Sequence, residues 1–195
     1  GDEKGMAASF DDIGKTHWLR GAYETALRFL QDGLVRREAQ GDKRSIALSW
    51  NNIGLVFQDS GQYKAAYDAL VKARDLRREA GDLPGLVVTL NNLGTIHSDR
   101  GEDHEAISIW KQALELAQEV GDRRRQAVLL LNVGEARCRM RDAEEALRIL
   151  TEVEQQCQEL GDRLLLAEAR RGLGKAYFLN NDLATARRYL ENALE

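Results

Sequence analysis

Apolar residues in the second forty residues of the chain recur at helical spacing in two successive blocks. The first block places four apolar side chains on one face of a helix: Ile46, Trp50, Ile53 and Phe57. The second block repeats this arrangement after a short break: Tyr63, Ala66, Leu70 and Ala73. A glycine follows each block, at Gly61 and Gly81, and glycine commonly ends a helix. The pattern therefore predicts two amphipathic helices of about 18 residues each, joined by a tight turn.

The same pattern returns every 40 residues, and three markers keep this spacing in five copies. The dipeptide Gly-Asp stands at 1–2, 41–42, 81–82, 121–122 and 161–162. A glycine inside the first helix of each copy stands at Gly14, Gly54, Gly94, Gly134 and Gly174. An alanine in the second helix stands at Ala26, Ala66, Ala106, Ala146 and Ala186. The sequence therefore predicts one domain, residues 1–195, with repeats at 1–40, 41–80, 81–120, 121–160 and 161–195.

Glycine and aspartate are expected to have different structural roles at each repeat junction. Glycine suits the left-handed conformation that ends a helix, and the aspartate side chain can cap the start of the next helix. The small residues inside the helices allow the two helices of a repeat to approach closely. A single helical hairpin cannot bury both of its faces, so successive repeats are expected to stack. These features predict an all-α fold of five stacked helix-turn-helix units.

The repeat resembles the tetratricopeptide repeat (TPR). In the second repeat the matching residues are Trp50, Ile53, Gly54, Phe57, Gly61, Tyr63 and Ala66. The last two repeats match less fully, because Arg141 and Asn181 replace the turn glycine. The resemblance covers the whole chain and implies a right-handed α-solenoid. Since the usual unit has about 34 residues, the longer unit resembles the TPR domains of polarity adaptors, kinesin light chains and bacterial peptide receptors.

Both ends of the sequence look like positions inside a longer array. Residue 1 is not methionine, and Gly1-Asp2 matches the internal repeat junctions. Glu195 falls inside an expected second helix, with no polar capping helix after it. We expect the sequence to be a fragment of a longer protein, and a complete natural protein is the alternative.

Composition excludes several classes of protein. The chain has 28 Lys and Arg against 32 Asp and Glu, for a net charge of −4, which argues against a dedicated nucleic-acid binder. Its apolar runs are too short to cross a membrane, and two cysteines cannot form a disulfide framework. With 43% hydrophobic residues, the chain has enough apolar material for a core. We expect a cytoplasmic protein that contacts neither nucleic acid nor membrane.

The sequence offers no catalytic constellation. The first two histidines are expected to pack inside their repeats and the third to face solvent: His17, His97 and His104. Cys138 and Cys157 fall on different helices and are expected to be reduced thiols. No His, Cys or carboxylate cluster has metal-ligand spacing, and the segment 172–175 lacks the Ser or Thr of a phosphate loop. We therefore expect no enzyme activity, no metal and no cofactor.

Asparagines recur in the first helices of repeats two, three and four. In stacked hairpins the first helices line the concave side. An amide side chain both donates and accepts hydrogen bonds, so it can hold the backbone of a peptide of any sequence. The resemblance to the adaptors implies this use. Alternatively, the asparagines bridge neighbouring helices, and both interpretations stay open. The candidate groove residues are Lys15, Asn51, Asn52, Asn91, Asn92, Asn132, Arg139, Arg171 and Lys175.

Unlike charges flank the asparagines. The early part of the groove carries Asp11, Asp12, Asp59 and Asp99, whereas the late part carries Arg139, Arg171 and Lys175. This asymmetry could orient a peptide whose acidic part meets repeats four and five, although solvated helix faces also explain such charges. The carboxylate clamp of chaperone-binding TPR domains does not fit, because only its middle asparagine has a match.

We expect a non-enzymatic adaptor or scaffold that binds an extended or helical protein segment in its concave groove. Acidic residues of that protein or peptide ligand would meet the late cations. A second hypothesis is a regulatory or sensor segment of a larger signalling or transcription protein. A third is self-association, in which the ends of two arrays stack head to tail.

Overall fold

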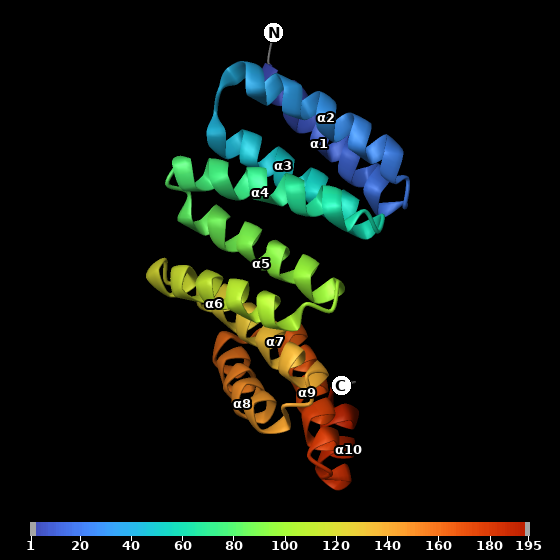
Figure 1. Cartoon of the computed structure of the whole chain (residues 1–195), viewed down its shortest axis with the longest axis vertical. Coiled ribbons are helices and arrows are strands. Elements are labelled where there is room, and N and C mark those ends of the chain that lie inside the picture. The colour runs from blue at the N-terminus through green and yellow to red at the C-terminus, as the bar shows by residue number, and fades with distance from the viewer. Residues whose placement is uncertain (1–2, 194–195) are drawn as a thin grey trace. The chain divides into compact units, whose positions relative to one another are not determined.

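The computed structural model describes residues 3–193, so the predicted junction at Gly1-Asp2 and the chain end at Glu195 lie outside the described residues. Within this range the chain forms ten α-helices and no strand (Figure 1). The helices are α1 (Glu3–Leu19), α2 (Tyr23–Gln40), α3 (Lys43–Asp59), α4 (Tyr63–Glu79), α5 (Leu83–Asp99), α6 (Asp103–Glu119), α7 (Arg123–Arg139), α8 (Ala143–Leu160), α9 (Arg163–Leu179) and α10 (Leu183–Asn192). The predicted all-α, helix-turn-helix organisation is confirmed.

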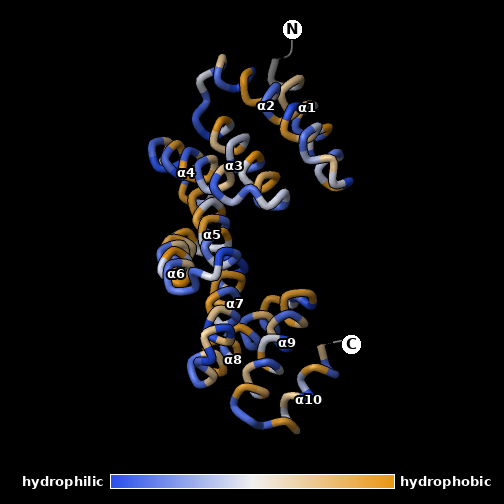
Figure 2. Tube along the Cα trace, turned by 45° about the vertical axis from the view of Figure 1, so that its right-hand side comes forward, coloured by the Kyte–Doolittle hydropathy of each residue, from blue (hydrophilic) through white to orange (hydrophobic). Residues whose placement is uncertain are grey.

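First and second helices of the repeats alternate along the chain. We call α1, α3, α5, α7 and α9 the A helices, and α2, α4, α6, α8 and α10 the B helices. Each helix carries apolar and polar positions in alternation, as Figure 2 shows along the Cα trace. In α3 the buried face includes Ala47, Ile53 and Val56. None of the helices among residues 3–193 combines the length and the apolar character needed to cross a bilayer.

The Gly-Asp dipeptides end one helix and begin the next. Gly41 adopts a φ of 74° and its N–H bonds to carbonyls in the last turn of α2. The Asp42 carboxylate accepts the backbone N–H of Ser45 at 3.3 Å, at the start of α3. Gly161 and Asp162 act in the same way between α8 and α9. At both junctions the structure confirms that glycine ends one helix and aspartate caps the next.

The chain divides into two compact units, Gly1–Ile96 (unit 1) and His97–Glu195 (unit 2). The border falls inside α5 and not at a repeat junction. In unit 1, α1 packs against α2, α2 against α3, and α3 against α4. In unit 2, α6 packs against α7, α7 against α8 and α9, α8 against α9, and α9 against α10. The assignment of residues 1–195 to a single array stays a prediction.

A glycine in the A helix allows a leucine of the B helix to approach closely. A Cβ atom on Gly54 would lie 2.8 Å from Leu70 Cγ, and one on Gly134 would lie 2.6 Å from Leu150 Cδ2. Both leucines are fully buried. Because carbon atoms do not pack this closely, any side chain at these glycines would push the hairpin apart. The close approach predicted from the small residues is confirmed.

Two residues with side chains take the left-handed turn conformation that glycine fills elsewhere. Arg141 has a φ of 61°, and its side chain is exposed. This conformation costs a residue with a Cβ atom about 1–2 kcal/mol. We expect Arg141→Gly to raise the free energy of unfolding by about 1 kcal/mol, because it removes the strain at an exposed site. Urea unfolding followed by circular dichroism measures this gain.

Two further variants control for the loss of the arginine side chain. Arg141→Ala keeps the Cβ atom and should leave the stability close to that of the wild type. Gly101→Ala introduces a Cβ atom at a φ of 76° and should lower the stability, although nothing lies within 4 Å of it. An equal gain for Arg141→Ala and Arg141→Gly would show that backbone strain is not the cause.

Candidate binding surface

The first three helices meet at a buried arginine. Arg37 of α2 donates from Nη1 to the Asp11 carboxylate of α1 at 3.0 Å and to Ser49 Oγ of α3 at 2.5 Å. Asp11 and Ser49 are buried. Burial raises the pKa of the Asp11 carboxyl, and the adjacent Arg37 guanidinium counteracts this rise. Because Ser49 belongs to the following repeat, this first polar junction (Asp11, Arg37, Ser49) joins repeat one to repeat two.

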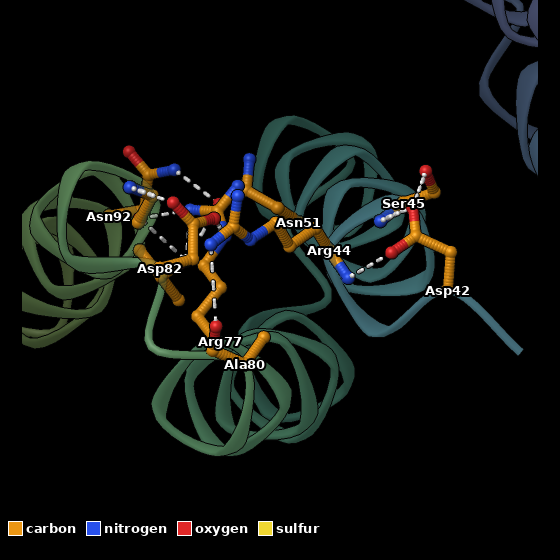
Figure 3. Close-up of polar contacts among 10 residues, drawn as sticks. Asp42, Arg44, Ser45, Asn51, Arg77, Ala80, Asp82 and Asn92 are labelled. Atoms are coloured by element: carbon orange, nitrogen blue, oxygen red, sulfur yellow. Dashed lines mark hydrogen bonds and ion pairs between the residues drawn. The ribbon is translucent and has the colours of Figure 1, made fainter.

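A second polar junction (Asn51, Arg77, Thr89, Asn92) lies 40 residues later and joins repeats two and three. Arg77 of α4 donates from Nη1 to Thr89 Oγ1 of α5 at 2.6 Å, and also to the Gly85 carbonyl. Thr89 donates to Asn51 Oδ1 of α3 at 3.4 Å. Asn92 Nδ2 donates to the same oxygen at 3.1 Å (Figure 3). The Asn51 amide therefore receives two hydrogen bonds from α5 and holds it against α3.

Gly85 makes room for the guanidinium of this second junction. A Cβ atom on Gly85 would lie 2.8 Å from Arg77 Nε. The Gly85 N–H in turn donates to Asp82 Oδ1 at 3.1 Å, which caps the start of α5. Pro84 is tolerated beside it because the first turn of a helix needs no donor at that position. The Pro84-Gly85 pair thus suits both the beginning of α5 and the approach of Arg77.

The predicted asparagines occupy different environments. Asn51 and Asn92 bridge α3 and α5, as in the alternative interpretation of the asparagine pattern. Asn52 is 7% exposed, and its Nδ2 has no hydrogen-bond partner among residues 3–193. Asn91 and Asn132 are partly buried, and each has an interaction partner within the chain. Contact of these amides with a ligand stays a prediction.

The sequence carries a signal for the polar junctions that the apolar pattern does not reveal. Arg37 and Arg77 stand 40 residues apart, as do Ser49 and Thr89. The equivalent residues of later repeats are apolar or small, and all are buried: Ala117, Leu129, Cys157 and Ala169. A buried arginine needs a hydrogen-bonded partner, so the joint recurrence of Arg with Ser or Thr could have indicated both junctions.

The histidines and cysteines take structural positions. The His17 ring stacks on Phe29, with centroids 5.5 Å apart, whereas His97 is partly buried and His104 is exposed. Cys157 is fully buried, and this burial raises the pKa of its thiol to about 11. Within the described part of the chain, no three His, Cys, Asp or Glu residues gather as metal ligands would. None of these groups forms a reactive cluster there.

Lys15 belongs to a different unit from the other predicted cations. It is exposed on α1 in unit 1. One turn later Trp18 donates its Nε1–H to the Asp59 carboxylate of α3 at 2.7 Å and packs against the apolar cluster of unit 1. The predicted site residues thus fall into two groups: Lys15, Asn51, Asn52, Asn91 and Asn92 in unit 1, and Asn132, Arg139, Arg171 and Lys175 in unit 2.

The three predicted site cations of unit 2 are each paired with a carboxylate of the same chain. Arg139 of α7 donates to both Asp103 oxygens, at 2.7 Å from Nη2 and 3.3 Å from Nε. Arg171 and Lys175 of α9 share the Glu135 carboxylate of α7, at 3.4 and 3.9 Å. The Lys175 ammonium has the longest of these contacts, and its side chain is 54% exposed. Lys175 is therefore the most weakly held cation of the three.

A pocket of about 410 Å³ opens beside these cations in unit 2. Helices α7, α9 and α10 line it, through Glu135, Cys138, Arg139, Gly174, Lys175, Phe178, Leu179 and Leu190. We call it the α7–α9 pocket. Its apolar wall includes Phe178, which is 63% exposed, and Leu190, which is 42% exposed. Burial raises the pKa of the Cys138 thiol in the lining. The pocket thus combines open apolar side chains with a charged rim.

Comparisons with known proteins place the repeat in a family. A model described as "Tetratricopeptide repeat" matches residues 45–121 and 125–195. A second model with the same description matches residues 6–39. No curated protein shows significant sequence similarity to the chain.

Three solved structures, each from a different kind of protein, have the same fold as this chain. BtubC (BKLC) from P. vanneervenii has 17% identity and a TM-score of 0.81, over 99% of this chain and 90% of that one. A STAND protein with a tetratricopeptide repeat sensor from Pyrococcus horikoshii has 18% identity and a TM-score of 0.84, over 96% and 28%. The Rap conjugation gene regulator of plasmid pLS20, in complex with a Phr peptide, has 16% identity and a TM-score of 0.78, over 95% and 51%. At these identities the similarity concerns the fold alone.

The second polar junction should contribute measurably to stability. Thr89→Val keeps the shape of the side chain but removes the acceptor used by Arg77 and the donor to Asn51. We expect it to lower the free energy of unfolding by about 1–2 kcal/mol, the cost of unmet buried hydrogen bonds. Equilibrium unfolding in urea measures the change.

Thr16→Val is the matched control. The Thr16 hydroxyl is exposed and donates only to the Asp12 carbonyl one turn earlier in α1, at 2.8 Å. Its replacement should change the stability by less than about 0.5 kcal/mol. Equal losses for the two variants would mean that the polar junction adds nothing to stability.

Proposed function

Because the chain belongs to the tetratricopeptide repeat family, we propose that it is a non-catalytic interaction module that binds an extended or helical segment of a partner protein. The A helices would supply the binding face. In unit 2 this face is the surface of α7 and α9 that borders the α7–α9 pocket.

The α7–α9 pocket is the observation that carries this proposal. Contiguous exposed apolar side chains on a protein surface are a common feature of binding sites. Phe178 and Leu190 are exposed in this way, at the mouth of a cavity. Its volume is in the range of ligand sites, which begin at about 300 Å³. An apolar wall with a few charged groups can take up a side chain of a bound protein segment.

The predicted cations fit the same proposal. Arg139, Arg171 and Lys175 border or adjoin the pocket, and their side chains are 44%, 53% and 54% exposed, so a ligand carboxylate can reach them. Asn132 also lies on α7 and stays a proposed ligand contact, as do Lys15 and the asparagines of unit 1. A scaffold or adaptor role follows if the bound segment belongs to another protein.

A sensor role in a longer chain is the second candidate. The Rap regulator with a similar fold was solved with a bound peptide, and the STAND protein carries its repeats as a sensor. This chain spans 51% and 28% of those two chains. These neighbours favour a peptide signal as the ligand, received by the same face of the A helices.

A peptide selection followed by nuclear magnetic resonance tests the proposal. Dodecapeptides are selected from a random phage library against the 195-residue chain, and the best binder is titrated into the isotope-labelled chain. We expect the largest chemical-shift changes in α7 and α9, because their exposed apolar and cationic side chains offer the most favourable contacts.

The outer surface of the B helices serves as the internal control. Arg148 and Glu152 of α8 are exposed and lie outside the α7–α9 pocket. Changes centred on these residues would overturn the assignment of the binding face. If the selection enriches no peptide at all, the proposal that the chain is a peptide-binding interaction module is wrong.

A further inference from the structure

We propose that unit 1 opens locally at the first polar junction, where the α1–α2 hairpin separates from α3 while α3 and α4 stay folded. A folded protein samples such openings at equilibrium, and they occur first where the fewest contacts are lost. The inference goes beyond the proposed function, because it concerns how repeats one and two are held together and needs no ligand. The second polar junction, 40 residues later, supplies the matched comparison.

The strongest contact of the first junction lies within repeat one. Arg37 of α2 forms its ion pair with Asp11 of α1, at 2.8 Å, and both residues belong to the hairpin that would separate. The pair therefore survives the opening. The hydrogen bond from Arg37 to Ser49 is the one that is lost, and water can replace the Ser49 hydroxyl in the open form.

The contacts of the second junction, in contrast, cross from one repeat to the next. Arg77 of α4 donates to the Gly85 carbonyl and to the Thr89 hydroxyl, both of α5. Asn51 of α3 accepts from Thr89 and from Asn92 of the same helix. Opening this junction would break all of these bonds at once, so it costs more free energy than opening the first junction.

Asn52 marks a hydrogen bond that the first junction lacks. Asn52 and Asn92 stand at the same position of successive A helices, and Asn92 Nδ2 donates across its junction to Asn51 at 3.1 Å. The counterpart of Asn51 in repeat one is Asp11, whose carboxylate is bonded to Arg37 instead. Asn52 is only 7% exposed, yet its Nδ2 has no hydrogen-bond partner among residues 3–193. Such a donor gains a water when the helices separate, which favours the open form.

The A helices are also less closely packed at the first junction than in unit 2. Helix α7 packs directly against α9, whereas among the described residues of repeat one it is α2 that packs against α3. Helix α1 reaches α3 through side chains, as where Trp18 donates to Asp59 at 2.7 Å. Less packed surface is therefore lost when the α1–α2 hairpin separates.

The opening would affect what the A helices of unit 1 can hold. Lys15 lies on α1, and Asn51 and Asn52 lie on α3. A segment that contacts both helices binds only the closed form, so it would hold the junction closed.

Native-state hydrogen exchange of the 195-residue chain, followed by nuclear magnetic resonance at low urea concentrations, tests the proposal. We expect the protected amides of α1 and α2 to exchange through one shared opening that leaves α3 and α4 protected. If α1, α2, α3 and α4 exchange through a single common opening, the proposal is wrong. No ligand is present, so the result is separate from that of the peptide selection.

Two substitutions at the same repeat position distinguish this opening from fraying of the first helices. Asn52→Leu removes the unmet donor and should slow exchange in α1 and α2 by about five- to thirty-fold. Asn92→Leu removes a donor that has a partner and should speed exchange in α3 and α4. Both changes replace Asn by Leu within an A helix, so the gain in helix propensity is the same in each. Faster exchange in α1 and α2 with Asn52→Leu would contradict the proposal.

Asn52→Met and Asn92→Met repeat the comparison with a flexible side chain that adapts to the available space, in case leucine disturbs the packing. The same opposite effects are expected. If Asn52→Met slows exchange equally in all helices of unit 1, its effect is on global stability, and the local opening at the first junction is excluded.

Discussion

The contact between a glycine of the A helix and a leucine of the B helix is the constraint on which the rest of the structure depends. It recurs as Gly14 with Leu30, Gly54 with Leu70, Gly134 with Leu150, and Gly174 with Leu190. Each contact sets how closely the two helices of a hairpin approach, and so which faces remain for the neighbouring repeat and for a ligand. In the last pair the same contact also forms a wall of the α7–α9 pocket. One wall of this candidate binding surface is therefore a packing contact that the other described hairpins within a unit also contain.

The polar junctions add a second constraint in unit 1. Arg37 and Arg77 are buried between three helices each, where an unpaired guanidinium would be very unfavourable. Ser49 and Thr89 supply the partners from the following repeat. A following hairpin with Leu129 or Ala169 at this position would deprive the buried arginine of its hydroxyl acceptor, so the junctions favour repeats two and three as neighbours over the later repeats. The equivalent positions of α6 to α9 are apolar or small and buried, and ion pairs elsewhere, such as Arg139 with Asp103 and Arg171 with Glu135, link the repeats there.

The elements could be predicted from the sequence to within a few residues, whereas the site could be predicted only in part. Helices and turns follow from local signals, since Gly41 and Asp42 act through their own backbone and side chain. The hydrogen bond between Asn51 and Asn92 joins two residues 41 positions apart. The sequence pattern is compatible both with this bond between helices and with amides that contact a ligand. The pairing of Arg139 with Asp103 depends on the approach of α6 and α7, which no local pattern describes. The pocket depends on the exposure of Leu190, a residue whose counterparts are all buried.

The proposed function rests on the A helices of unit 2, where Phe178 and Leu190 line an apolar pocket with a charged rim. Photo-cross-linking tests this account most directly. A benzophenone amino acid replaces Phe178 in one variant and the exposed Glu152 of α8 in another, and each is irradiated with the selected peptide. The account predicts a covalent adduct from position 178 and none from position 152. An adduct from position 152 alone would contradict it.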